Sequence, residues 1–75
     1  MDKELLGIVE KEVATFRYGA PITIYDIRVV AEADGHDLSR WDGRSIGIAL
    51  ARICETRDGP YGKKDYRSFY RRCPQ

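Results

Sequence analysis

The chain has 75 residues, of which 43% are hydrophobic and 33% charged, and its formal net charge is +1. This composition is typical of a soluble globular protein with one domain, residues 1–75, and it argues against a disordered chain. No apolar run approaches the roughly 20 residues of a membrane span, and the polar opening Met1-Asp2-Lys3-Glu4 predicts a cytoplasmic protein without a signal peptide.

Residues 2–17 are predicted to form an amphipathic helix. Asp2 is expected to cap it or to favour its N-terminal dipole, and Gly19 and Pro21 are expected to end it. The apolar residues recur every three or four positions, which places them on one stripe: Leu5, Leu6, Val9, Val13 and Phe16.

A short extended piece at residues 22–23 is expected to lead into a second helix. Thr23 is the predicted N-cap, and Asp26 three residues later completes a variant of the capping box. Gly35 is expected to end this helix. Its predicted buried side consists of Ile24, Ile27, Val30 and Ala31.

Residues 36–41, HDLSRW, are predicted to be a connector that buries Leu38 and Trp41. The third helix then begins with Asp42 as its cap, although Ser39 is an alternative cap. The buried side of this helix is predicted to contain Ile46, Leu50, Ile53 and Cys54.

The third helix is predicted to contain two glycines, although a glycine inside a helix lowers its stability by about 1 kcal/mol relative to alanine. Gly43, Gly47 and Ala51 are spaced four residues apart and would form a groove of small residues. We expect the first or second helix to cross closely at this groove. An alternative is that Gly47 makes room for the backbone of a ligand.

The last third of the chain predicts a β-hairpin. Its strands are expected near residues 57–61 and 66–72, and they are joined by a basic tip at residues 62–65. Alternation along the second strand predicts two faces: Tyr66, Ser68 and Tyr70 on one, and Arg67, Phe69 and Arg71 on the other.

The balance of basic and acidic residues differs between the two halves of the chain. Residues 1–36 contain four Lys/Arg and seven Asp/Glu, whereas residues 37–75 contain nine and five. The basic C-terminal half predicts a surface for polyanions.

Cys54 and Cys73 are expected to be free thiols, one buried and one loose, with a single disulfide as the alternative.

The face of the third helix opposite its buried side carries Arg44, Ser45, Ile48, Arg52 and Glu55. Arginine binds guanine or phosphate, serine binds phosphate, and an apolar group contacts the thymine methyl. These residue types therefore predict contact with DNA. An exposed Ile48 is also compatible with an ordinary protein surface.

The order of helices and hairpin resembles a winged helix-turn-helix domain, of the type found in small phage and replication-associated proteins. The stretches that carry the resemblance are ITIYDIRVVAEADG, RSIGIALARI and YGKKDYRSFYRR. It implies an α+β fold, with a three-helix core and a small C-terminal β-hairpin wing. It also implies a regulatory protein that binds double-stranded DNA.

In such a domain the third helix would enter the major groove and the wing would contact the DNA backbone or the minor groove. Arg71 and Arg72, near the base of the hairpin, are further candidates for backbone contacts. The implied DNA-binding residues are Arg44, Ser45, Ile48 and Arg52 on the helix, and Lys63, Lys64 and Arg67 on the wing.

A different function remains open, in which the same fold binds a protein or a second copy of the chain. Ile48 and Trp41 would then be the anchors, and an acidic surface made of Glu4, Glu10, Glu12 and Glu32 would face the partner.

No enzyme, metal or cofactor is expected. His36 is the single histidine and is expected in a turn, and neither cysteine has a second histidine to complete a metal site. The spacing of Asp34, Asp37 and Asp42 fits no calcium loop.

Overall fold

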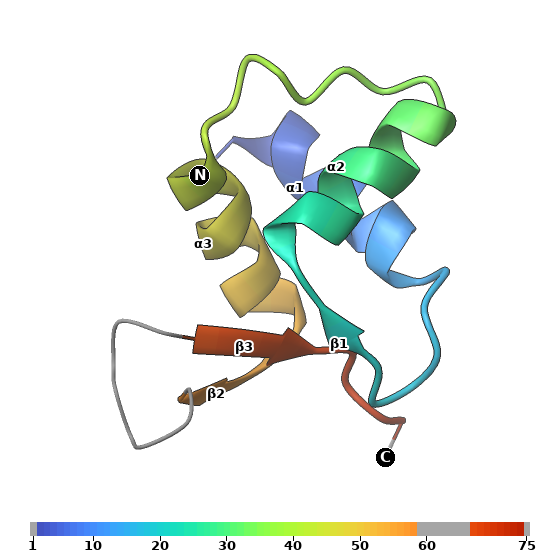
Figure 1. Cartoon of the computed structure of the whole chain (residues 1–75), viewed down its shortest axis with the longest axis vertical. Coiled ribbons are helices and arrows are strands. Elements are labelled where there is room, and N and C mark those ends of the chain that lie inside the picture. Colours follow the sequence, from blue (N-terminus) through green and yellow to red (C-terminus); the bar gives the residue numbers. More distant parts are fainter. Residues whose placement is uncertain (1, 59–66, 75) are drawn as a thin grey trace.

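The computed structural model describes residues 2–58 and 67–74. Three helices lie above a small antiparallel sheet whose strand order is β1-β3-β2 (Figure 1), which confirms the predicted α+β fold class with a helical core and a C-terminal hairpin. The elements are α1 (Lys3–Val13), β1 (Pro21–Ile22), α2 (Ile24–Ala33), α3 (Gly43–Ile53), β2 (Glu55–Asp58) and β3 (Arg67–Tyr70).

The predicted N-caps of α1 and α2 are confirmed. The Asp2 carboxylate accepts hydrogen bonds from the backbone N–H groups of Glu4 and Leu5, at 2.9 and 3.3 Å. Thr23 and Asp26 form the capping box, because each side chain accepts a hydrogen bond of 2.9 Å from the backbone N–H of the other residue. These side chains satisfy donors that a helix leaves without partners at its first turn.

Helix α3 begins after Asp42, whose carboxylate accepts a hydrogen bond of 2.8 Å from the Ser45 N–H. The alternative cap, Ser39, lies instead in a turn in which its own N–H donates to the Asp37 carboxylate at 2.9 Å. A side chain four positions before the first helical residue cannot reach its N–H groups, so the nearer carboxylate caps the helix.

Helix α1 is shorter than predicted, ending at Val13 rather than at residue 17. Thr15 closes the helix end, since both its hydroxyl and its N–H donate to the carbonyl of Glu12. Gly19 lies in a later turn with a φ of 78°, and its N–H donates to the Arg71 carbonyl at 2.8 Å. The glycine therefore ties this turn to the chain that follows β3.

The sheet contains one pairing that the hairpin alone did not predict. β1 pairs with β3, with Ile22 opposite Phe69, so the chain before α2 joins the chain after α3. β2 pairs with the other edge of β3, with Thr56 also opposite Phe69. β2 begins at Glu55, two residues earlier than predicted, because it follows the end of α3 almost directly.

One hydrophobic core lies between the three helices and the sheet. The predicted stripes are confirmed, with Leu6, Phe16, Ile24, Val30 and Ile53 only half-buried. The buried apolar residues are Leu5, Val9, Val13, Ile22, Ile27, Ala31, Leu38, Ile46, Ala49, Leu50 and Cys54.

None of the helices in the described segments has the length and apolar character needed to cross a bilayer.

The predicted groove of small residues is wrong. Gly43 is the first residue of α3, and a Cβ atom there would meet nothing within 4 Å. A Cβ atom at Gly47 would lie 3.5 Å from Ile24 Cδ1 and 4.0 Å from Phe69 Cζ, which are the ends of side chains. The neighbour at Gly47 is thus α2, one of the two helices expected there, but it contributes a side chain and not the closely approaching backbone that the prediction required.

Candidate nucleic-acid interface

Four of the predicted DNA-binding residues, Arg44, Ser45, Ile48 and Arg52, lie on α3 and define what we call the α3 outer face. Arg44 and Arg52 are exposed, Ser45 is half-buried and Ile48 is 48% exposed. The opposite side of the helix is packed into the core through Ile46, Ala49 and Leu50. The amphipathic pattern thus places these side chains at the surface, as the sequence predicted.

The arginines of the protein fall into two groups. Among those whose side chains the structure describes, the guanidinium groups of Arg17, Arg44 and Arg52 form no hydrogen bond or ion pair with any described residue. The others are held by the protein itself: Arg28, Arg40, Arg57, Arg71 and Arg72. Within the described part of the chain, the α3 outer face therefore presents two guanidinium groups whose donors have no protein partner.

The structure leaves the predicted wing residues largely untested. Lys63 and Lys64 lie outside the described residues, as does Tyr66 of the predicted second strand. Arg67 begins β3 and is paired with Asp58, but its side chain is not among those described. The ends of β2 and β3 that the tip joins lie on the same side of the molecule as α3 (Figure 1).

Two arginines at the base of the hairpin are engaged inside the protein. The Arg71 guanidinium donates to the carbonyl of Phe16 and stacks 4.0 Å above the Tyr18 ring. Arg72 donates to the carbonyl of Ile53 at 3.2 Å. Their place at the hairpin base is as predicted, yet each uses one donor to join the chain after β3 to another segment: Arg71 to the chain after α1, and Arg72 to the end of α3.

Both aromatic residues of β3, Phe69 and Tyr70, are half-buried. Phe69 is half-buried and packs against the core. The Tyr70 ring lies 4.1 Å from the Arg57 guanidinium carbon, in a cation–π contact. Both residues therefore have structural contacts of their own.

A hollow of about 410 Å³ lies beside the α3 outer face. It joins residues that are far apart in the sequence, since Asp2 and Leu5 come from the start of the chain. The sequence indicated Asp2 only as a helix cap, and no local signal marked it as a neighbour of α3. The lining residues are Asp2, Leu5, Trp41, Ser45, Ile48 and Arg52.

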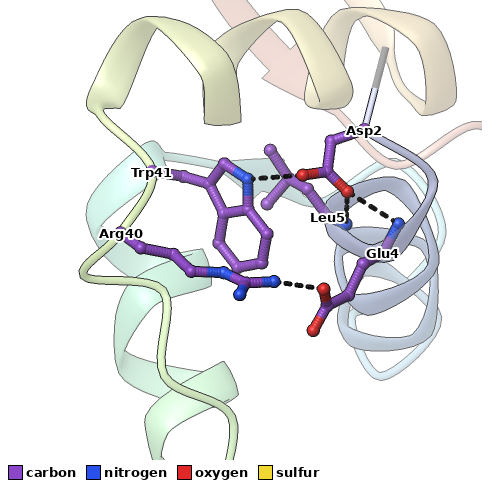
Figure 2. A network of polar contacts seen from close by, with 5 residues as sticks. All are labelled: Asp2, Glu4, Leu5, Arg40 and Trp41. Carbon is purple, nitrogen blue, oxygen red and sulfur yellow. Dashed lines mark hydrogen bonds and ion pairs between the residues drawn. The ribbon is translucent and has the colours of Figure 1, made fainter.

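Figure 2 shows the polar network that holds one wall of this hollow. The Trp41 Nε1–H donates to the Asp2 carboxylate at 3.0 Å, and the Arg40 guanidinium lies 4.1 Å from the Trp41 ring centroid. Arg40 also forms an ion pair with Glu4. Trp41 is thus half-buried and fixed to the first turn of α1, so it lines the hollow and is not the freely exposed anchor that the second interpretation required.

Two acids beside the α3 outer face, Asp2 and Asp42, have lowered pKa values. The hydrogen bond from Trp41, followed by the one from the Leu5 N–H, lowers the pKa of Asp2. Hydrogen bonds from Ser45 lower the pKa of Asp42. The carboxylates of Asp2 and Asp42 are held by hydrogen bonds within the protein and contribute negative charge next to Arg44 and Arg52.

The predicted acidic surface is only partly present. Glu4, Glu10 and Glu32 are exposed, but Glu12 is only 2% exposed and cannot face a partner. It lies near the end of α1 on the buried side of the helix, next to Val13. A charge count along the sequence does not distinguish such a position from its exposed neighbours.

Both cysteines are free, which excludes the alternative of a disulfide between them. Cys54 is buried and Cys73 exposed, as predicted. Burial raises the pKa of the Cys54 thiol, so this group behaves as a small apolar core residue.

The arrangement on α3 is suited to binding a negatively charged, groove-containing partner. It combines two available guanidinium groups, one hydroxyl and one exposed apolar side chain on a single helix face. Comparison with known proteins adds no further assignment. The chain matches no protein-family model, and no curated protein or solved structure is significantly similar to it.

Proposed function

We propose that this protein is a small regulator of transcription or replication that binds double-stranded DNA, with α3 in the major groove and the hairpin on the DNA backbone. The observation that carries the proposal is the pair Arg44 and Arg52, exposed on one face of α3 without a described partner inside the protein. The order of elements and the strand order β1-β3-β2 also agree with a winged helix-turn-helix domain.

The spacing along α3 supports this geometry. Arg44 and Arg52 are eight residues apart, which corresponds to about 12 Å along a helix axis. The major groove of B-DNA is about 12 Å wide and admits one helix. Two guanidinium groups at this separation can bind at different positions along the groove, with Ser45 and Ile48 between them.

The proposal includes a second copy or a partner protein, because one small module buries little DNA surface and reads few base pairs. It also includes the wing residues Lys63, Lys64 and Arg67 as contacts to phosphates. A cytoplasmic location belongs to the same proposal, since the two free thiols, Cys54 and Cys73, stay reduced there.

Fluorescence anisotropy with a random-sequence duplex at about 50 and 200 mM salt tests the proposal first. Each phosphate contact contributes about −0.9 to the slope of log K against log salt. Affinity is expected to fall steeply between the two salt concentrations for the wild type. Absence of binding at the lower salt, at tens of micromolar protein, would contradict the proposal.

Single alanine variants then locate the interface. Arg44→Ala and Arg52→Ala are expected to weaken binding to a selected site by about 5- to 150-fold if each reads a base, since a bidentate arginine contributes about 1–3 kcal/mol. Lys64→Ala should weaken binding to all sequences and reduce the salt slope by about one contact.

Arg17→Ala is the matched control. Arg17 is also exposed and without a described partner, so its removal changes the net charge equally. The segment between α1 and β1 that carries it runs along the right of Figure 1, whereas α3 lies at the left. Equal losses in Arg17→Ala and Arg52→Ala would show that net charge, not the α3 outer face, determines binding.

The hollow beside α3 favours a second candidate function, binding of a protein through an apolar contact. Leu5, Trp41 and Ile48 line it, and Ile48 is 48% exposed. Exposed apolar side chains beside a hollow are typical of protein interfaces. A partner that is retained after nuclease treatment and lost on Ile48→Glu would support this function. DNA affinity that is unchanged in the triple variant R44A/R52A/K64A would also favour it.

A further inference from the structure

The ends of α1 and α2 bring together three side chains that are separate in the sequence: Glu12, Asp34 and His36. One carboxylate oxygen from each acid and one ring nitrogen of the histidine lie within 4.8 Å of one another. More than twenty residues separate Glu12 from the other two, so no local motif signals the cluster. It lies away from the α3 outer face and has no part in the function proposed above.

The backbone at the end of α2 positions two of these side chains. Asp34 is the C-cap, and Gly35 follows in a left-handed conformation with a φ of 86°. The Gly35 N–H donates to the Glu32 carbonyl at 3.0 Å, and the His36 N–H to the Ala31 carbonyl at 2.9 Å. This is the hydrogen-bond pattern of a Schellman motif, which turns His36 back beside the helix end.

Burial makes the third side chain unusual. Glu12 is only 2% exposed, and its Oε1 has no hydrogen-bond partner among the described residues. His36 Nε2 is likewise buried without a described partner. Buried polar atoms are normally paired, and a buried carboxylate is strongly unfavourable without a cation or a donor. Two unpaired polar atoms in one acidic cluster indicate a ligand that accepts electron pairs from both.

We propose that Glu12, Asp34 and His36 bind one divalent transition-metal ion, for which Zn²⁺ is the best match. Mg²⁺ and Ca²⁺ prefer sites made only of oxygen atoms, whereas an imidazole nitrogen suits zinc. Three protein ligands leave the fourth tetrahedral position to water, as in open zinc sites. The two carboxylates balance the charge of the ion, which removes the cost of the buried Glu12.

The arrangement requires a small closure to reach coordination distance. Ligands at about 2.0–2.2 Å from a tetrahedral zinc ion are about 3.4 Å from each other. The three ligand atoms lie within 4.8 Å of one another, so a separation at that limit would have to shorten by about 1.4 Å. The Asp34 side chain is 46% exposed and can rotate. The distance between the Asp34 carboxylate and the Lys11 ammonium group is long, at 3.7 Å, and both side chains are exposed. This ion pair therefore opposes the rotation only weakly.

Histidine NMR provides a direct test, because His36 is the only histidine in the chain and its ring signals need no assignment. Addition of ZnCl₂ to the full-length protein is expected to shift these signals until one equivalent is bound. The same concentration of MgCl₂ should leave them unchanged. Unshifted ring signals in excess zinc, or equal shifts with magnesium, would overturn the proposal.

Thermal unfolding with and without zinc gives a second, independent readout. Binding to the folded state raises Tm, and this rise should disappear in both His36→Ala and Glu12→Gln. Cys73→Ser is the matched control, because Cys73 is an exposed thiol that could capture zinc on its own. A rise in Tm that persists in His36→Ala but is lost in Cys73→Ser would identify an adventitious thiol complex and refute the site. If Glu12→Gln fails to fold, His36→Ala and the NMR titration of the wild type still decide.

Discussion

The connector of residues 36–41 and the α3 outer face are adjacent in the chain, and both carry arginine, yet they use their polar groups in opposite ways. Arg28 from α2 donates to the carbonyls of Leu38 and Trp41 in the connector, at 3.1 and 2.9 Å. Arg40 stacks on Trp41 and pairs with Glu4. Arg44 and Arg52, a few residues later, contact no described polar partner. The contrast separates charges that stabilise the fold from charges that are available to a ligand.

The largest effect is expected from Arg28→Ala, which removes the side-chain donor to the Trp41 carbonyl and one of two donors to the Leu38 carbonyl, the other being the Trp41 N–H. Charged hydrogen bonds of this kind contribute about 1.5–3 kcal/mol each, and losses at one side chain are not additive. The free energy of unfolding should fall by about 2 kcal/mol in urea denaturation. Arg44→Ala is the matched control and should change stability by less than about 0.5 kcal/mol. Equal losses in the two variants would remove the distinction between the two regions.

The next largest changes in stability are expected at two glycines, one in α3 and one just before the connector. Gly47→Ala should stabilise the protein by about 0.5–1 kcal/mol, because the new methyl group would make ordinary contacts with Ile24 and Phe69. Gly35→Ala, just before the connector, should destabilise it by about 1 kcal/mol, since its φ is 86°. Thermal denaturation measures both. A destabilised Gly47→Ala would restore the idea that α3 needs a small residue for close packing.

A smaller effect is expected from Trp41→Phe, which removes the main cause of the lowered pKa of Asp2. A carboxyl whose pKa is lower in the folded state adds stability above its unfolded pKa, and this stability is lost as pH falls through the folded value. The variant should therefore be less stable than the wild type at neutral pH, and the difference should shrink in acid. Urea denaturation of both proteins, from neutral pH down to acid, measures this difference in the free energy of unfolding.

The double variant that combines Trp41→Phe with Asp2→Ala provides the control for this pair. If the hydrogen bond in Figure 2 is responsible, Trp41→Phe should cost little in the Asp2→Ala background. A full additional loss in that background would assign the effect to packing of the indole ring instead.

The helices, their N-terminal ends and the C-terminal end of α2 were predictable because the interactions that define them are local. The caps at Thr23 and Asp42 each bind an N–H three residues away, and Gly35 ends α2 within two residues. Apolar spacing identified the core side of each helix, and therefore also the side of α3 that carries Arg44 and Arg52. The length of α1 was overestimated, since apolar spacing continues to Phe16 although the helical hydrogen bonds end at Val13.

Only the tertiary structure decided which distant residues meet. The amino-acid sequence by itself determined the three helices, the hairpin and the exposed face of α3, because hydrogen bonds within four residues and a regular apolar period are properties of short segments. The pairing of β1 with β3, the contact of Asp2 with Trp41 and the cluster of Glu12, Asp34 and His36 depend on how those segments pack. Glu12 occupies a position whose burial and neighbours are set by α2, so its sequence context could not reveal them.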